Sequence, residues 1–428
     1  MSQHDESHPA EIQFPLDKLV AGRWRVVRTL GQGGCGIVYE VEDMNNKPQR
    51  AALKVEPNNA AGGVLKIEAE VLKQLQDRPY TIRLLQSAKR QDYSFIVLTL
   101  CGPDLDNVRE LHSLPRFTES TTLRIGIHCL YAIKQLHEIG YIHRDVKPNN
   151  MVIGVEKHDR RLVYLIDYGM VRRYASEDHN NKWVLKQPRS NTALRGTLRY
   201  CSVNVHKRRD QGRVDDLWSL VYMMAELRGP LPWIKCTRED RLIIMKNKFD
   251  TGANHSAMRE LDCLKPIVAH LSTCGFGDRP DYLLIFNSIM KQIRAKGYRF
   301  SDPYDWETSK ETAPNASESS RSEISRNSND TNTPSTMTAI DGDDKTQNEN
   351  TPRAEEPATA IERPSILPDT QESLADEALF PHIKARNFLQ CPGDIPGKKF
   401  TEFYKKSVRR RSRRPTREEK PPSSSNAS

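Results

Sequence analysis

The residues best suited to chemistry are concentrated in one octamer, from His143 to Asn150, which reads His-Arg-Asp-Val-Lys-Pro-Asn-Asn. Asp145 carries a carboxylate that can accept the proton of an attacking hydroxyl group, and Asn150 follows with an oxygen that can hold a magnesium ion. Lys147 would place positive charge where a transferred phosphoryl group develops negative charge. The spacing predicts phosphoryl transfer to a hydroxyl group, although a polar surface loop could contain the same letters by chance.

A second magnesium ligand is predicted at the end of a strand. Residues 162–166 are apolar enough to form a buried strand, and the triplet Asp167-Tyr168-Gly169 follows them. A carboxylate in this place can bind magnesium, so we expect Asp167 and Asn150 to hold the metal together. Tyr168 would fill an apolar slot, where its hydroxyl group needs a hydrogen-bond partner.

A glycine-rich segment near the start of the chain could hold a nucleotide. Residues 30–38 read Leu-Gly-Gln-Gly-Gly-Cys-Gly-Ile-Val between two strand-like segments. Glycines let a hairpin close over a triphosphate with its amide groups facing the phosphates. A dinucleotide site would need a helix inside the motif, whereas a second strand follows here, and a plain glycine-rich hairpin remains the alternative. The nucleotide contacts predicted from this segment are Leu30, Gly31, Gly33, Gly36 and Val38.

The next strand and helix are expected to supply a buried ion pair. Residues 51–55 read Ala-Ala-Leu-Lys-Val, and a lysine on such an apolar strand would be costly unless it held phosphate groups. Residues 64–75 have helical periodicity. Glu68 lies on the apolar face of that helix and Glu70 does not, so we predict Glu68, rather than a surface glutamate, as the partner of Lys54.

Two further elements would position these groups. Residues 95–98 predict a buried strand that ends where a chain segment could present backbone groups to adenine, with Leu98 and Leu100 as nucleotide contacts. Residues 118–139 predict a long amphipathic helix, which begins at Thr118 and delivers the chain to the octamer.

The polar residues are distributed unevenly along the 428 positions, of which 37% are hydrophobic. Residues 1–20 and about 306–375 are rich in Ser, Thr, Asn, acidic residues and Pro, and cannot bury enough apolar surface to offset the entropy of ordering. We therefore predict a disordered N-terminal segment (1–20), one domain (21–305) and a mostly disordered Ser/Thr-rich tail (306–428). The domain has the length of a two-lobed enzyme.

The net charge of +9 draws attention to a basic run from Lys405 to Arg417. A nuclear-import signal, a site for an acidic polymer and a merely solvated tail all explain this run. No aromatic platform accompanies it, so nucleic acid binding is disfavoured as the main function.

The eight cysteines show no Cys-x-x-Cys and no paired Cys/His spacing, which disfavours zinc and thioredoxin-like sites. Reduced thiols fit a cytoplasmic or nuclear protein. Cys35 at the tip of the glycine-rich loop has no flanking cation, and we interpret it as an unreactive small residue. The N-terminus has no apolar signal core, and the most apolar stretch, 217–227, contains Glu226, so no membrane span is predicted.

One further segment is diagnostic. Residues 195–206 read Arg-Gly-Thr-Leu-Arg-Tyr-Cys-Ser-Val-Asn-Val-His, where other enzymes with the preceding motifs carry Ala-Pro-Glu. With the motifs around Asp215-Asp216 and Leu231-Pro232-Trp233, the sequence from about 21 to 305 resembles a eukaryotic protein kinase of the casein kinase 1 superfamily, and is most similar to its tau-tubulin kinase branch. This resemblance implies an α+β, bilobal protein-kinase fold with a mainly β N-lobe and a mainly α C-lobe. It also implies that Asp216 anchors the catalytic loop.

The resemblance implies a serine/threonine protein kinase that uses ATP and Mg²⁺, since Lys147 marks this class rather than tyrosine kinases. The essential polar positions are all filled: Lys54, Glu68, Asp145 and Lys147 for catalysis, and Asn150 and Asp167 for the metal. An active enzyme, expected to be a monomer, is therefore predicted. The alternative is a pseudokinase scaffold that binds ATP without turnover, and a tail that docks on a cytoskeletal or other partner could coexist with either.

The resemblance further suggests a preference for acidic or pre-phosphorylated substrates. Arg189 occupies one basic position of the expected anion pocket, whereas Thr192 and Thr237 stand at two others. Nearby basic residues at 207–209 keep the neighbourhood positive. Because the Ser/Thr-rich stretch 308–375 has acidic neighbours and is tethered to the domain, we also expect autophosphorylation there.

Overall fold

The computed structural model describes residues 12–33, 36–45, 49–58, 63–156, 159–251, 256–308, 383–390 and 394–395. All of them belong to one of the two compact units into which the chain divides, and the other unit, Lys310–Gln371, lies outside the described residues. The predictions for residues 1–11, for Cys35, for most of the Ser/Thr-rich tail and for the basic run after Lys405 also fall outside them.

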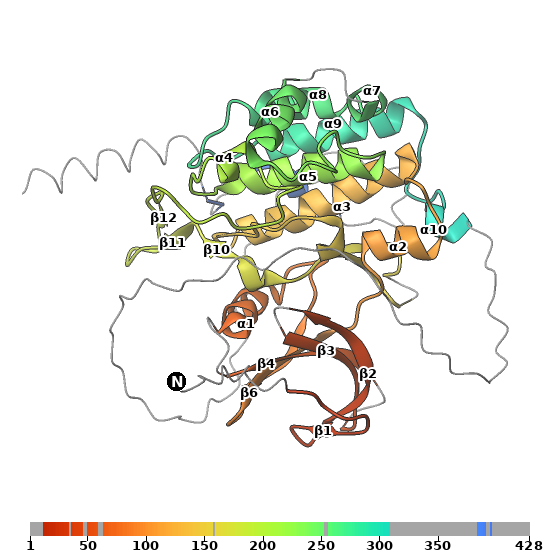
Figure 1. Ribbon diagram of the computed structural model, residues 1–428, viewed down its shortest axis with the longest axis vertical. Coiled ribbons are helices and arrows are strands. Elements are labelled where there is room, and N and C mark those ends of the chain that lie inside the picture. The colour runs from red at the N-terminus through yellow and green to blue at the C-terminus, as the bar shows by residue number, and fades with distance from the viewer. Residues whose placement is uncertain are drawn as a thin grey trace, which may run out of the picture. The chain divides into compact units, whose positions relative to one another are not determined.

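The first part of the chain forms a curled antiparallel sheet with one helix against it (Figure 1). The strand order is β1-β2-β3-β4-β6-β5. Along β3, Ile37, Tyr39 and Val41 are buried at every second position, as expected for a strand with one face on a core. The elements are β1 (Leu19–Val20), β2 (Trp24–Gly33), β3 (Gly36–Asp43), β4 (Arg50–Pro57), α1 (Val64–Leu75), β5 (Leu84–Lys89) and β6 (Tyr93–Thr99).

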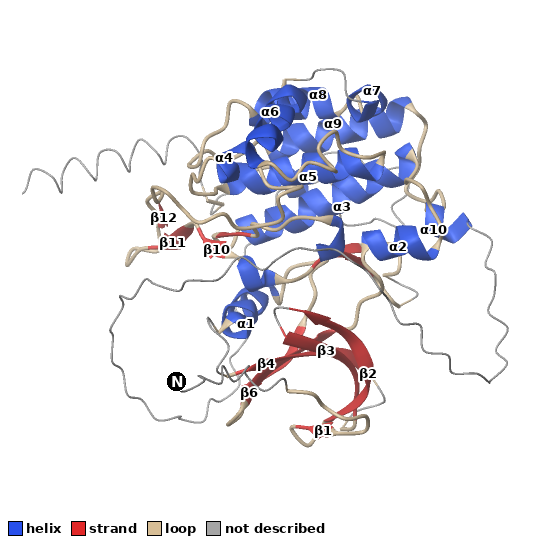
Figure 2. Ribbon diagram, viewed as in Figure 1, coloured by secondary structure: helices blue, strands red, loops and turns tan. Residues whose placement is uncertain are grey.

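The second part is mainly helical, and Figure 2 shows the contrast with the strands of the first part. Its helices are α2 (Leu105–Leu111), α3 (Glu119–His137), α4 (Val203–His206), α5 (Arg213–Leu227), α6 (Glu239–Asp250), α7 (Ser256–Glu260), α8 (Leu264–Leu271), α9 (Tyr282–Ala295) and α10 (Asp305–Thr308). Its short strand pairs are β7 (Tyr141–Ile142) with β10 (Arg172–Arg173), β8 (Met151–Ile153) with β9 (Val163–Leu165), and β11 (Ala175–Glu177) with β12 (Trp183–Leu185). The predicted α+β, bilobal fold is confirmed. Among the described helices, none is both long and apolar enough to cross a membrane.

Helix α3 lies in the middle of the helical lobe. Thr118 caps its N-terminus by accepting a hydrogen bond from the amide of Thr121 (3.3 Å), which agrees with the predicted start. The expectation of an amphipathic helix is wrong, because every residue from Thr121 to His137 is buried. Even Arg124 is enclosed, since its guanidinium donates to the carbonyls of Asp302 and Pro303.

The ordered part of the chain begins before residue 21. Phe14 is buried, stacks on Tyr39 with ring centroids 5.5 Å apart, and donates its amide proton to the Tyr39 hydroxyl (2.9 Å). Lys18 covers the Phe14 ring from outside, 3.9 Å from its centroid. The predicted disorder therefore does not extend to residues 12–20, because one aromatic side chain in a polar segment completes the outer core of the sheet.

The domain also continues past residue 305. The Asp305 carboxylate accepts hydrogen bonds from the amide of Thr118 (2.6 Å) and the hydroxyl of Thr121 (2.9 Å), so it fixes α10 against the start of α3. Residues 383–390 and 394–395, which the sequence placed in a mostly disordered tail, return to the helical lobe, where Ile383, Phe388 and Ile395 are buried. They are the blue stretches in the bar of Figure 1.

Candidate active site

A slot of about 380 Å³ lies between the sheet and the helical lobe. All predicted nucleotide contacts line it: Leu30, Gly31, Gly33, Gly36, Val38, Lys54, Leu98 and Leu100. Ala52, Ile82, Val152 and Ile166 also line it and were not predicted. Ala52 could have been found, because it lies two positions before Lys54 on β4 and therefore faces the same way, whereas the other three come together only in the fold.

Gly36 is required by close packing at the mouth of this slot. Its φ of 107° is a backbone conformation that residues with a side chain rarely adopt. A Cβ atom added there would lie 2.0 Å from the carbonyl oxygen of Val55 on β4. The glycine at this position therefore lets β3 approach its neighbour closely.

The expected ion pair between β4 and α1 is present. Lys54 Nζ lies 2.8 Å from Glu68 Oε2 and 3.1 Å from Asp167 Oδ1. Burial alone would lower the pKa of Lys54, but the two carboxylates raise it overall, so the ammonium group stays charged. Glu70, on the other side of α1, instead pairs with Arg173 at 2.6 Å.

The Asp145 carboxylate is held from three sides. Its Oδ1 accepts hydrogen bonds from the amide (2.9 Å) and the hydroxyl (2.7 Å) of Thr197, and its Oδ2 lies 2.9 Å from Lys147 Nζ. Lys147 also donates to the Thr197 hydroxyl (3.3 Å). Thr197 was recognised only as part of a motif, and its contact with the predicted proton acceptor was missed, since the two residues are far apart in the chain.

The backbone of the octamer is anchored by the buried Asp216 carboxylate on α5. It accepts hydrogen bonds from the amides of His143 (2.7 Å) and Arg144 (2.8 Å), and its Oδ2 lies 2.9 Å from His137 Nε2. Arg144 has a φ of 70°, a conformation that costs free energy and needs such support. The anchoring role implied for Asp216 thus has the expected geometry.

Tyr168 occupies the buried position beside α1 that the sequence predicted for it. Its hydroxyl donates to the carbonyl of Leu165 (3.0 Å), which meets the requirement for a partner. Its ring lies edge-on to His143 with centroids 5.7 Å apart. The residue therefore ties the strand end at Asp167 to the octamer.

The donor atoms suit a magnesium ion held partly by phosphate. Burial would raise the pKa of Asp167, but Lys54 lowers it below its usual value, so this carboxylate is ionised. The Asn150 amide group donates to the Asp145 carbonyl (2.8 Å), which leaves its oxygen as a ligand atom. Within the described residues, no group of three His, Cys, Asp or Glu side chains could hold a metal alone. Mg²⁺ commonly takes one or two protein ligands and completes its shell with phosphates and water.

Positive charge is concentrated behind the octamer. Burial, followed by the charges of Arg172, Arg189 and Arg195, lowers the pKa of Arg144 to about 10. The Arg144 guanidinium donates to the carbonyl of Met170 (2.6 Å) rather than to a carboxylate. Arg172 and Arg189 are themselves paired with Asp210, at 2.8 and 3.3 Å, so part of the positive charge of the segment after Asp167 is compensated.

The two-lobed fold, the glycine-lined slot and the charged groups at its inner end define the site of a protein kinase. The protein kinase domain family matches residues 24–271. The chain therefore belongs to the protein kinase family, and the predicted enzyme class is confirmed.

The similar proteins indicate the branch of the protein kinase family to which this chain is related. A Caenorhabditis elegans protein provisionally named as a serine/threonine-protein kinase is 41% identical over 309 residues, which cover 71% of this chain and 87% of that relative. A similarly named Dictyostelium discoideum protein is 35% identical over 298 residues, which cover 69% of this chain and 59% of that relative. A Caenorhabditis elegans protein named as an inactive tau-tubulin kinase is 34% identical over 251 residues, or 56% of this chain and 86% of that relative. The predicted resemblance to the tau-tubulin kinase branch is confirmed.

Proposed function

We propose that this chain transfers the γ-phosphate of ATP to serine and threonine hydroxyl groups of proteins. The observation that carries the proposal is the Asp145 carboxylate, fixed by Thr197 and Lys147 while Lys54 and Glu68 form their ion pair. Protein kinases need both this lysine–glutamate pair and the metal-binding aspartate in place for catalysis. The arrangement therefore supports an active enzyme.

Each group has a distinct part in the proposed mechanism. ATP with Mg²⁺ supplies the phosphoryl group, and the metal neutralises part of its charge. Asp145 orients the substrate hydroxyl group and accepts its proton, and Lys147 faces the negative charge that develops. Lys54, held by Glu68, would bind phosphate oxygens, while Asp167 and Asn150 would offer oxygens to the metal. The apolar walls of the slot enclose the base.

Phosphate transfer from labelled ATP to a serine peptide tests this proposal. Asp145→Asn should reduce turnover by orders of magnitude and leave nucleotide binding nearly unchanged, because only the proton acceptor is lost. Asp167→Asn should also weaken binding of ATP in the presence of Mg²⁺. Wild-type turnover in both purified variants would refute the assignment of the site.

The second candidate is a pseudokinase that binds ATP without turnover. It is favoured by one observation, the relative whose name describes an inactive kinase. The same assay separates the two, since a pseudokinase would bind ATP and show no more transfer than its Asp145→Asn variant.

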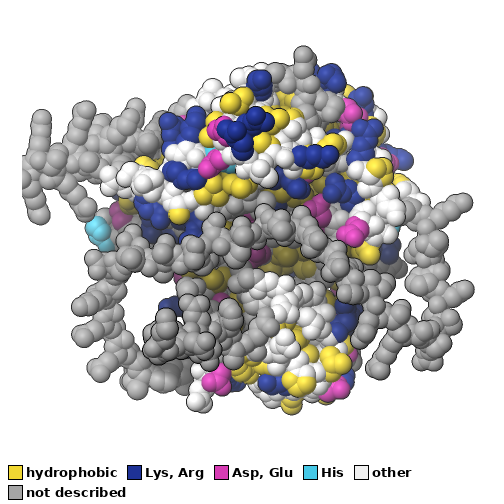
Figure 3. Space-filling model, in the orientation of Figure 1, with side chains coloured by type: hydrophobic (Ala, Val, Ile, Leu, Met, Phe, Trp, Pro, Cys, Tyr) yellow, Lys and Arg dark blue, Asp and Glu magenta, His cyan; other side chains and the backbone are white. Residues whose placement is uncertain are grey.

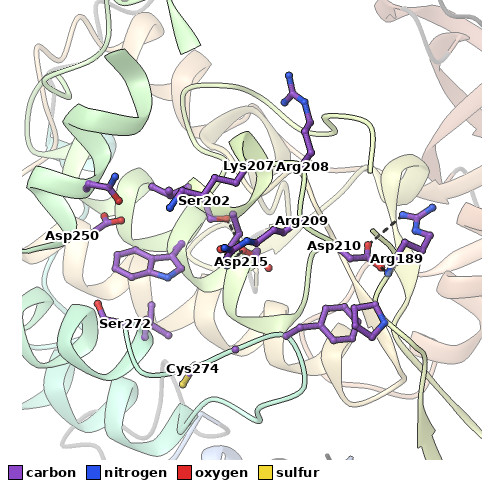
Figure 4. Close-up of a pocket in the computed structure, with 18 of the residues that line it drawn as sticks. Arg189, Ser202, Lys207, Arg208, Arg209, Asp210, Asp215, Asp250, Ser272 and Cys274 are labelled. Atoms are coloured by element: carbon purple, nitrogen blue, oxygen red, sulfur yellow. Dashed lines mark hydrogen bonds and ion pairs between the residues drawn. The ribbon is translucent and has the colours of Figure 1, made fainter. Parts of the chain in front are cut away.

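We infer that acidic or phosphorylated side chains near the acceptor raise the rate. A cavity of about 1060 Å³ beside the segment that follows Asp167 is lined by four cations and three carboxylates (Figure 4): Arg189, Lys207, Arg208, Arg209, Asp210, Asp215 and Asp250. Lys and Arg side chains are also numerous over the helical lobe on the face seen in Figure 3. This excess of positive charge supports an anionic partner.

The basic residues of the cavity are not equivalent. Arg189 is joined to Asp210 at 3.3 Å, as the dashed line in Figure 4 shows, and Arg208 is bound by both oxygens of Glu239 at 2.8 Å. Lys207 and Arg209 are exposed, and neither has an ion pair with the part of the chain that the structure describes. They are the cations best able to receive a new anion.

Thr192, at a position expected to be basic, has a structural part in this arrangement. Its amide donates to the Arg208 carbonyl (2.9 Å), and its hydroxyl donates to the carbonyls of Arg208 and Arg209. It therefore supports the loop that carries Lys207 and Arg209 instead of contributing charge.

Peptides that differ only in neutral, acidic or phosphorylated residues beside the acceptor test the preference. The Lys207→Ala/Arg209→Ala variant should lose it, whereas Lys291→Ala, which removes an exposed cation elsewhere, should keep it. Exposed pairs contribute about 0.2–1 kcal/mol, so each acidic residue should raise kcat/KM by about 1.4- to 5-fold, and less at high salt. Equal preference in the double variant and the wild type would contradict this inference.

The tail extends the proposal. We infer that the enzyme phosphorylates its own Ser/Thr-rich stretch, which is tethered to the domain. We also infer that the run from Lys405 to Arg417 serves nuclear import or docking on an acidic partner. The protein would then work in the cytoplasm, the nucleus or both. Site mapping after incubation with Mg²⁺ and ATP, and imaging of a variant without residues 405–417, test these points.

A further inference from the structure

The C-terminal segment, defined as residues 383–390 and 394–395, packs on the helical lobe against a surface, here named the groove, that is formed by Tyr131, Ile142, Arg213, Arg279 and Phe286. Its Phe388 ring stacks on Phe286 of α9, with centroids 4.5 Å apart and an interplanar angle of 19°. The same ring meets Tyr131 of α3 edge-on at 5.7 Å. Phe388 and Ile383 are each only 1% exposed, so both belong to the core of the lobe.

The other end of the segment reaches the strand that precedes the octamer. Ile395 is fully buried in a small cluster with Ile142, Tyr174, Ala175 and Leu185. Ile142 immediately precedes His143. Tyr174, Ala175 and Leu185 belong to the segment that follows Asp167. A side chain from far along the chain therefore completes the packing beneath the proposed catalytic loop.

Charged groups fix the position of this end. Arg279, whose side chain is 6% exposed, lies 3.0 Å from Asp394 and 2.7 Å from Glu138. Lys134 lies within 4 Å of the same two carboxylates. Two cations thus face two carboxylates in a nearly buried cluster, and one of the four comes from the C-terminal segment.

A buried arginine makes the final contact. Arg213, which begins α5, is fully buried and donates to the carbonyl of Ile395 (3.0 Å). Three residues later on the same helix, Asp216 binds the amides of the octamer. The C-terminal segment therefore contacts β7, which leads into the octamer, and the start of α5, the helix whose Asp216 anchors the octamer backbone.

We propose that this groove is a binding site for the chain's own C-terminal segment, residues 383–390 and 394–395, and that its occupation positions the catalytic loop. The recognised features are two apolar side chains near the start, Ile383 and Phe388, and an acidic–apolar pair at the end, Asp394 and Ile395. The occupant is the same chain, because its own Asp394 pairs with Arg279 (3.0 Å) and its own Ile395 carbonyl accepts a hydrogen bond from Arg213 (3.0 Å). The positioning part of this proposal builds on the proposed kinase function, and the binding part does not.

The binding part is tested by stability in the full chain. Phe388→Ala removes the ring between α3 and α9 and should lower Tm by at least about 6 °C. Leu389→Ala is the matched control, because Leu389 is the next residue in the chain and is 41% exposed. This variant should shift Tm by less than about 2 °C. An unchanged Tm in the Phe388 variant would overturn the proposal.

A peptide of residues 383–395 provides a second measurement. Added in excess to the Phe388→Ala protein, it should restore most of the lost Tm, whereas the same peptide with alanine at 388 should not. Rescue by both peptides would show non-specific stabilisation and would overturn the proposal. Light scattering should find a monomer, and a dimer that exchanges C-terminal segments would overturn the assignment to the same chain.

The positioning part is tested by kinetics. Ile395→Ala should lower kcat by at least about 5-fold and leave KM for ATP nearly unchanged, because the loop shifts while the nucleotide slot does not. Ile395→Val should recover most of the rate. Unchanged kcat in the alanine variant would overturn the positioning role. If the wild type has no turnover but Phe388→Ala still loses stability and the peptide restores it, the kinase proposal fails and the groove stands.

Discussion

Replacing Thr197 by valine would show whether the hydrogen bond from the Thr197 hydroxyl to the Asp145 carboxylate contributes to turnover. The Thr197 hydroxyl donates to Asp145 Oδ1 at 2.7 Å, and the amide of the same residue donates to that oxygen at 2.9 Å. Valine has nearly the same shape and keeps the hydrogen bond from the backbone amide. It removes the longer bond from Lys147 (3.3 Å) and, above all, the hydroxyl's hydrogen bond to the Asp145 carboxylate. Such a bond contributes about 1.5–3 kcal/mol, which corresponds to a decrease in kcat of about 10- to 150-fold if it acts fully in the transition state.

Steady-state kinetics on purified protein would measure this effect. KM for ATP should change by less than about 2-fold, because Thr197 does not line the nucleotide slot. Thr197→Ser keeps the hydroxyl group and serves as the control, with a rate close to that of the wild type. A valine variant as active as the serine variant would show that the contact has no part in catalysis.

Three further substitutions follow from the geometry. Gly36→Ala places a Cβ 2.0 Å from a carbonyl oxygen of β4, so it should weaken nucleotide binding by at least about 10-fold in calorimetry; unchanged affinity would contradict the packing argument. Glu68→Gln should lower kcat/KM by at least about 10-fold, because the ion pair with Lys54 loses its negative charge, whereas Glu70→Gln on the same helix should change it little. Burial lowers the pKa of His128 from 6.5 to about 3, so the stability contributed by its neutral ring is present above pH 6.5 and is lost toward pH 3, by about 1.4 kcal/mol per pH unit. Urea unfolding should show that His128→Asn flattens this dependence, and equal slopes in both proteins would contradict it.

Most of the active site could be predicted because its residues form short motifs. Asp145, Lys147 and Asn150 lie within one octamer. The helical period alone was enough to predict that Glu68, and not Glu70, faces Lys54. In each case, the side-chain direction follows from a local conformation that the neighbouring residues also favour.

The helical core was harder to predict. Helix α3 was found within two residues at its C-terminal end, but its complete burial was not, since charged residues on it such as Arg124 and Lys134 suggest a solvated face. Arg124 is accommodated by carbonyls near α10, and Lys134 by Glu138, one turn further along the chain, and by Asp394. The carbonyls near α10 and Asp394 are more than a hundred residues away from α3, and periodicity contains no information about them.

From the sequence alone, short motifs predicted the groups that would hold ATP and magnesium, since fixed spacings and local backbone preferences are sufficient for these. The resemblance that the same motifs carry implied the class of enzyme and the two-lobed fold. Only the tertiary structure decided that Thr197 binds Asp145, that Phe14 belongs to the sheet, and that Phe388 and Ile395 belong to the helical lobe. Each of these side chains lies in a segment whose composition is otherwise polar or irregular. Whether such a segment is ordered depends on apolar and charged partners distant in the sequence, and those partners are brought together only when the chain folds.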